Sequence, residues 1–165
     1  MKFLHLADLH LGKLMHDLSL LPDQAFILDR ILSIASREKP DAVLIAGDVY
    51  QRSAPQAEAM ALFDRFVSGL AEKGIRVFII SGNHDSALRI SYFSSLIRSS
   101  GVFVSEAFDG ILRYVSMQDE YGSLLWLQVT IHERGDLGAV RSLDALRKRK
   151  RCRGQAIGCG SVWTR

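Results

Sequence analysis

The chain has 165 residues, of which 48% are hydrophobic and 24% charged, and its formal net charge is +3. These values fit one globular domain with a buried core, and no apolar run approaches the roughly 20 residues of a membrane span. Because the N-terminus also lacks the charged-then-apolar pattern of a signal peptide, we expect a cytoplasmic protein without membrane contact.

The positive charge is concentrated at the C-terminal end. Residues 128–165 contain 9 of the 21 Lys and Arg but only 3 of the 18 Asp and Glu. The basic pI therefore says little about the rest of the chain. Cys152 and Cys159 also lie in this segment, and their spacing fits neither a zinc knuckle nor a disulfide framework.

Short apolar runs alternate with helical patterns up to about residue 105. The runs at 2–7, 42–47 and 75–80 are rich in Val, Ile and Phe, which predicts buried strands. A helical pattern that opens at Pro22 separates the first two runs, and another that opens at Pro55 separates the second and third.

The alternation continues beyond the third run. The second helix is expected to end at Gly74, a third helix to cover about 87–98, and a short strand to follow at 102–104. This strand–helix–strand order predicts parallel strands joined by right-handed crossovers, which is an α/β fold. The runs at 111–116 and 123–128 indicate further strands, in a second sheet.

Side chains that bind metals follow each of the first three predicted strands. Asp8 and His10 follow the first strand, Asp48 follows the second, and Asn83 and His84 follow the third. In a parallel sheet these three loops emerge at the same edge, where open α/β folds place their ligands. We therefore expect the five residues to share one site.

The residue types predict metal-assisted phosphoester chemistry. Asp8 and His10 are two residues apart on what we expect to be extended backbone, so both should point to the same side. Carboxylate, imidazole and carboxamide form a mixed O/N set that suits Mn²⁺, Fe²⁺ or Zn²⁺. Asp48 follows Gly47, which lets backbone come close, and is placed to bridge two ions that activate water. His84 is placed to protonate the leaving oxygen or to hold the phosphate.

The motifs D-L-H, G-D-V-Y and G-N-H-D resemble the opening motifs of the calcineurin-like metallophosphoesterases. The wider stretches F-L-H-L-A-D-L-H-L-G-K and F-I-I-S-G-N-H-D-S-A-L-R-I-S-Y-F are similar to a narrower group, the bacterial SbcD family. That family is the nuclease subunit of the SbcCD complex for repair of DNA double-strand breaks. The resemblance covers roughly residues 1–127.

The resemblance implies a four-layered α/β sandwich and assigns roles to the site residues. Metal ligands would be the following: Asp8, His10, Asp48 and Asn83. His84 would be the catalytic acid or the phosphate contact. The implied cofactors are two divalent ions, with manganese the expected metal.

The resemblance also implies an activity and partners. The family cuts DNA ends and hairpins as an exonuclease and endonuclease in repair, recombination and replication, and it works with the SMC-like ATPase SbcC. It forms a homodimer through helices that correspond here to segments near 55–70 and 87–98. Lys13, His16 and Arg52, which follow the first two motifs, are candidate DNA contacts, and solvated loops are the alternative interpretation.

The resemblance ends after about Leu127. The family continues with an isolated His and a G-H-x-H pair that complete its two-metal site, whereas this sequence has no G-H-x-H and its one later histidine, His132, lies in no matching context. We therefore expect 1–127 to be the N-terminal part of a nuclease domain with a truncated fold. Residues 128–165 would be a non-matching tail, out of frame and without regular structure.

Two other functions remain open from the sequence. The chain could belong to a metallophosphoesterase that acts on a small phosphoester, because fold logic does not identify a substrate. It could also be a catalytically inactive fragment that dimerises or binds a partner, since the later His ligands are absent. For the nuclease itself, we expect the activity of this chain to be impaired, because the later His ligands are absent.

Overall fold

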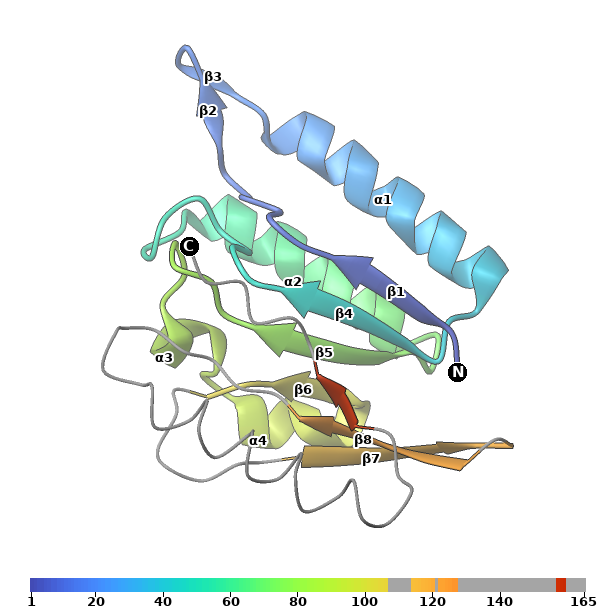
Figure 1. Cartoon of the computed structure of the whole chain (residues 1–165). Coiled ribbons are helices and arrows are strands. Elements are labelled where there is room, and N and C mark those ends of the chain that lie inside the picture. Colours follow the sequence, from blue (N-terminus) through green and yellow to red (C-terminus); the bar gives the residue numbers. More distant parts are fainter. Residues whose placement is uncertain (107–113, 121, 128–156, 160–165) are drawn as a thin grey trace. The chain divides into compact units, whose positions relative to one another are not determined.

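The computed structural model describes residues 1–106, 114–120, 122–127 and 157–159. By its internal contacts the chain forms two compact units, Met1–Glu106 and Ala107–Arg165. The candidate site residues predicted from the sequence all belong to the first unit. Figure 1 colours the elements in chain order.

A parallel sheet forms the centre of the N-terminal unit. Its strands occur in the order β1 (Phe3–Leu6), β4 (Ala42–Ala46), β5 (Arg76–Ile80) and β6 (Val102–Val104). All neighbouring pairs are parallel, so the carboxyl ends of the strands lie along one edge (Figure 1). The α/β fold predicted from the alternation of strands and helices is confirmed.

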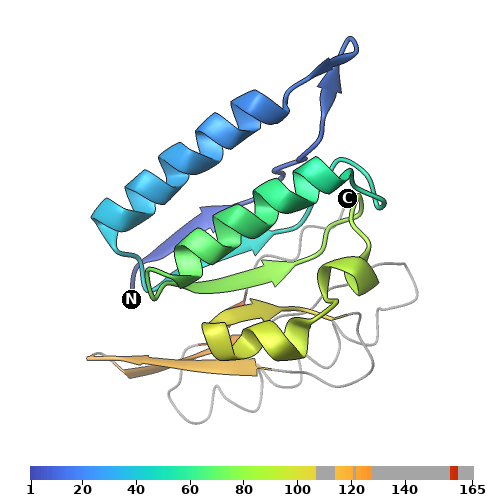
Figure 2. The same ribbon diagram turned by 180° about the vertical axis from the view of Figure 1, so that it is seen from behind.

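The N-terminal unit also contains two long helices. α1 (Leu21–Glu38) packs against α2 (Ala57–Ala71), and α2 contacts β5 (Figure 2). α1 has its proline in the first turn, as predicted. α2 begins later than predicted, because Gln56 is extended with ψ of 151° and leaves Pro55 outside the helix. Across the described ranges, no helix combines the length and apolar character that crossing a membrane requires.

The hydrophobic core of this unit lies between the sheet and the two helices. β4 and β5 alternate in side-chain direction, so every second residue of each strand faces α1 and α2. The apolar face of α2 is part of this core, since Phe63, Phe66 and Leu70 are buried in it. Phe66 is only 1% exposed, and its truncation would cost about 3–5 kcal/mol. This core holds the strand ends in place.

The segment 87–98 corrects one prediction. Instead of a single helix it forms α3 (Ala87–Ile90) and α4 (Ser94–Ile97), followed by the 3₁₀ turn η1 (Arg98–Ser100). Phe93 separates the two helices with φ of +69°. An aromatic residue rarely adopts this left-handed backbone, and it interrupts the helical hydrogen bonds.

The second unit contains a separate sheet. β7 (Tyr114–Asp119) pairs antiparallel with β8 (Gly122–Leu127), which pairs in parallel with β9 (Ile157–Cys159). The second sheet predicted from the runs at 111–116 and 123–128 is confirmed where the structure describes these runs, in β7 and β8. The prediction of a tail without regular structure is wrong at β9. This short strand forms because it pairs with β8, and the local sequence shows no periodicity that would indicate it.

Candidate metal centre

The loops after β1 and β4 are joined to each other beyond the ends of their strands. The N–H of Asp8 donates to the carbonyl of Gly47 at 3.2 Å. Farther along, the N–H of His10 donates to the carbonyl of Asp48 at 2.9 Å. The parallel pairing therefore continues into the loops and brings the first two motifs side by side (Figure 1).

Three of the five predicted site residues form a cluster. His10, Asp48 and His84 each offer a ligand atom, and these atoms all lie within 4.8 Å of one another. Nε2 of His10 is 3.9 Å from Oδ2 of Asp48. The rings of His10 and His84 meet edge to face with their centroids 5.0 Å apart. The Asp48 side chain is only 13% exposed, so this carboxylate is largely shielded from water.

The other two predicted ligands lie at the margin of this cluster. Oδ1 of Asp8 is 3.9 Å from Nε2 of His10, and the Asp8 side chain is 70% exposed. Asn83 precedes His84 in the same loop and is exposed. His132 lies outside the described residues.

The backbone of the first motif corrects another prediction. Asp8 and His10 have φ values of +55° and +43°, so the D-L-H stretch is not extended. Asp48 is also left-handed, with φ of +49°. Left-handed backbone costs roughly 1–2 kcal/mol per non-glycine residue, less for Asp because its short side chain can bond locally. Such strain persists only where surrounding contacts enforce it, and it concentrates at functional sites.

Asp85 provides one of these contacts, and the sequence did not reveal its role. The residue is 5% exposed. Its carboxylate accepts hydrogen bonds from the backbone N–H groups of Val49 at 3.0 Å, Tyr50 at 2.9 Å and Gly82 at 2.9 Å. Asp85 therefore joins the loop after β4 to the loop after β5. Its position in G-N-H-D was a signal of importance, but a local pattern could not distinguish a ligand from a structural anchor.

Two glycines allow the loops after β4 and β5 to approach each other closely. A Cβ added at Gly47 would come within 2.9 Å of the Cα of Gly82, and a Cβ at Gly82 would overlap Asp48. The close backbone approach predicted at Gly47 is confirmed. A side chain at Gly47 would therefore collide with the backbone of Gly82, and one at Gly82 would displace the Asp48 carboxylate.

His84 is oriented by two contacts. Its backbone N–H donates to Oδ1 of Asp48 at 2.9 Å, and its ring atom Nδ1 lies 3.2 Å from the carbonyl oxygen of Gln51. A proton on Nδ1 would be donated to that carbonyl and would leave Nε2 as the basic nitrogen. This arrangement suits a residue that binds a metal or exchanges a proton through Nε2.

Tyr50 lies beside Asp85 and cannot act as a base at ordinary pH. Burial raises the pKa of its phenol to about 12, and the negative charges of Asp85 and Asp64 add to this increase. The ring packs edge-on against Phe63, with the centroids 5.6 Å apart. Its contribution is packing beneath the loop after β4.

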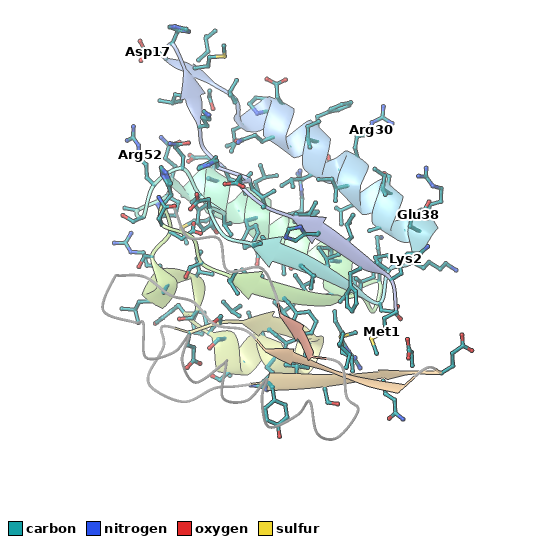
Figure 3. The ribbon with its side chains drawn as sticks, viewed as in Figure 1. Met1, Lys2, Asp17, Arg30, Glu38 and Arg52 are labelled. Carbon is teal, nitrogen blue, oxygen red and sulfur yellow. The ribbon has the colours of Figure 1, made fainter. Side chains whose placement is uncertain are left out.

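The candidate DNA contacts lie outside the cluster. A hairpin of β2 (Leu14–Met15) and β3 (Leu18–Ser19) follows the first motif, and His16 and Asp17 form its left-handed turn. Figure 3 shows Asp17 at this turn and Arg52 on the loop after β4. The three predicted contacts, Lys13, His16 and Arg52, are all exposed.

The cluster fits a divalent metal ion. Two imidazoles and a shielded carboxylate form the mixed N/O set typical of Mn²⁺, Fe²⁺ or Zn²⁺. Nδ1 of His10 is buried and has no hydrogen-bond partner in the described part of the chain. A buried nitrogen without a partner is costly unless it binds something. The residues present therefore suit a metal centre.

Comparison with known proteins agrees with this chemistry. The family model for calcineurin-like phosphoesterases matches residues 1–151. Over 105 residues the chain is 40% identical to the SbcD component of the nuclease SbcCD from Staphylococcus saprophyticus subsp. saprophyticus. The aligned part is 63% of this chain and 28% of that relative, so the chain spans less than a third of its length. The resemblance to the SbcD family is confirmed.

Proposed function

Because the chain belongs to the calcineurin-like phosphoesterase family, we propose that it is the N-terminal part of a nuclease that hydrolyses phosphodiester bonds in DNA. The observation that carries this proposal is the cluster of His10, Asp48 and His84, whose ligand atoms lie within 4.8 Å at the ends of parallel strands. The 40% identity to a nuclease component favours DNA over a small phosphoester as the substrate.

The proposed cofactors are two divalent ions, with manganese the metal to test first. The proposed ligands are Asp8, His10, Asp48 and Asn83. Such ions supply a hydroxide at neutral pH and neutralise charge on the phosphate. The Asp48 carboxylate is proposed to bridge the ions, which is supported by its central position between the first and third loops.

His84 is proposed to protonate the leaving oxygen or to hold the phosphate. The contact of its Nδ1 with the Gln51 carbonyl supports this role, because that contact fixes the ring and leaves Nε2 available. Its place in the 4.8 Å cluster also allows His84 to be a metal ligand. His84→Gln distinguishes the roles: unchanged Mn²⁺ affinity with lost hydrolysis indicates the acid or phosphate contact, and lost affinity indicates a ligand.

The direct test compares two substrates with the purified chain. Mn²⁺-dependent release of nucleotides from labelled duplex ends and opening of hairpins would be measured beside hydrolysis of bis-p-nitrophenyl phosphate, with EDTA and Asp48→Asn as controls. Cleavage of DNA that EDTA abolishes supports the nuclease. Cleavage of the aryl diester alone would replace it with a small-molecule phosphoesterase.

The proposed partners are DNA, an SbcC-type ATPase and a second copy of the chain. Self-association through α2 and α3–α4 is supported by large apolar side chains that α3, α4 and their connection expose: Leu88, Tyr92, Phe93 and Leu96. Because the proposed substrate is DNA, we propose that the protein acts in the bacterial cytoplasm, in DNA repair, recombination and replication.

A non-catalytic role is the second candidate. The sequence lacks the G-H-x-H of the SbcD family. This difference favours weak activity in this chain and a residual role in self-association. We also retain the proposal that residues 128–165 are out of frame; the DNA sequence after codon 127 tests it, since another frame should then encode an isolated His and a G-H-x-H.

A further inference from the structure

The side chain of Gln24, in the first turn of α1, contacts the backbone of the loop that carries Asp8 and His10. Its Nε2 donates to the carbonyl oxygen of His10 at 2.8 Å and to that of Leu9 at 3.1 Å. Its Oε1 accepts a hydrogen bond from the N–H of Gly12 at 3.0 Å. One amide group therefore satisfies three backbone groups around His10.

These contacts lie on the side of the loop that the sheet leaves open. β1 is an edge strand of the described four-stranded sheet. The N–H groups of Asp8, His10 and Leu11 donate toward the loop after β4. Gln24 instead donates to carbonyl groups of the same loop, so the loop is held between the loop after β4 on one side and α1 on the other. Backbone groups in a partly buried loop require such partners.

The loop needs this support because its backbone is strained. Asp8 and His10 both have positive φ values, of +55° and +43°. A loop free of Gln24 would relax toward right-handed or extended backbone, which most non-glycine residues prefer. Such a change would redirect the His10 ring, because φ and ψ set the direction of the Cα–Cβ bond.

We propose that Gln24 is a positioning residue, which holds the loop after β1 in its left-handed conformation and thereby aims His10 into the metal centre. It does not touch the proposed ions and acts only through His10. The inference deepens the proposed function and rests on it for the identity of the metal. The helix that carries Gln24 is itself held by the core, through the buried Leu28, so the amide is attached to a rigid element.

Two substitutions separate the three hydrogen bonds. Gln24→Met keeps the length and helix propensity of the side chain and removes all three bonds. Gln24→Glu keeps an acceptor for the N–H of Gly12 but removes both donors to Leu9 and His10. The matched controls are Gln118→Met and Gln118→Glu, because Gln118 is exposed on β7.

The first measurement needs no metal. Amide hydrogen exchange by NMR should show loss of protection at Gly12 in Gln24→Met and retained protection in Gln24→Glu, with amides inside α2 unchanged in both. The nuclear Overhauser contact between the His10 and His84 rings, whose centroids are 5.0 Å apart, should weaken in both variants and persist in the controls. Unchanged Gly12 exchange and an unchanged ring contact in Gln24→Met would overturn the proposal.

The second measurement is Mn²⁺ affinity, followed through the EPR signal of the free ion. We expect both Gln24 variants to bind Mn²⁺ about 10- to 100-fold more weakly than the unaltered chain, the usual effect of losing a residue that orients a ligand. Affinity within twofold in folded Gln24→Met would contradict positioning. If the unaltered chain binds no Mn²⁺, the proposed function fails, and the metal-free measurement still decides the role of Gln24.

Discussion

The backbone N–H of His84 donates a 2.9 Å hydrogen bond to Oδ1 of Asp48, whose other carboxylate oxygen lies 3.9 Å from Nε2 of His10. One carboxylate thus connects the loops after β1 and β5, although it belongs to the loop after β4. Because the three loops start from neighbouring parallel strands, the position of Asp48 is set by the sheet. A change at Asp48 should therefore affect the whole cluster.

We expect Asp48→Asn to reduce Mn²⁺ affinity and any Mn²⁺-dependent hydrolysis by about 100-fold or more, because the amide retains the size of the carboxylate but loses its charge. The measurement is Mn²⁺ titration by EPR together with the cleavage assay. Asp64→Asn is the control, since Asp64 is exposed on α2. Equal losses in both variants would show a general charge effect instead of a metal centre.

Asp85→Ala should destabilise the protein by about 3 kcal/mol or more, because three buried or half-buried N–H groups lose their acceptor at once. Urea unfolding followed by circular dichroism measures the change in the free energy of unfolding. Asp64→Ala should change it by less than about 0.5 kcal/mol, as expected for a surface position. A similar small change in Asp85→Ala would contradict the role of Asp85 as the anchor of two loops.

The raised pKa of Tyr50 predicts that the protein loses stability at alkaline pH. The pKa of its phenol in the folded chain is about 12, above the ordinary value of 10.0, so folding favours the neutral phenol. Its contribution to stability is therefore complete below pH 10 and is lost as the pH rises from 10 through 12. The free energy of unfolding should fall less steeply over this window in Tyr50→Phe. If the free energy of unfolding falls equally steeply in both proteins, folding does not raise the pKa of Tyr50.

Leu96→Asp should shift the chain toward monomer, because Leu96 on α4 is 67% exposed and belongs to the surface proposed for self-association. Multi-angle light scattering over a concentration series measures the shift. Leu18→Asp, at a hairpin position that is 72% exposed, is the control and should leave the mass unchanged. A monomeric unaltered chain would end the proposal of a homodimer.

The interruption of the predicted helix at Phe93 shows a feature that sequence patterns do not predict. The apolar spacing of 87–98 is compatible with one helix, yet the chain turns at Phe93 with φ of +69°. Hydrophobic periodicity reports which face of an element is buried, but it does not report a single residue forced into left-handed backbone. The same limit applies to β9, which exists through pairing with β8.

Local patterns were enough to predict the parallel strands and the loops that carry Asp8, His10, Asp48 and His84, because apolar runs and the polar residues that end them are adjacent in the chain. The left-handed backbone of these loops and the roles of Asp85 and Gln24 became visible only in the folded chain. The bonds of Asp85 to Val49 and Tyr50 join residues 36 and 35 positions apart. Hydrogen-bond partners so far apart in the sequence are brought together by the packing of strands and helices, so no local pattern predicts them.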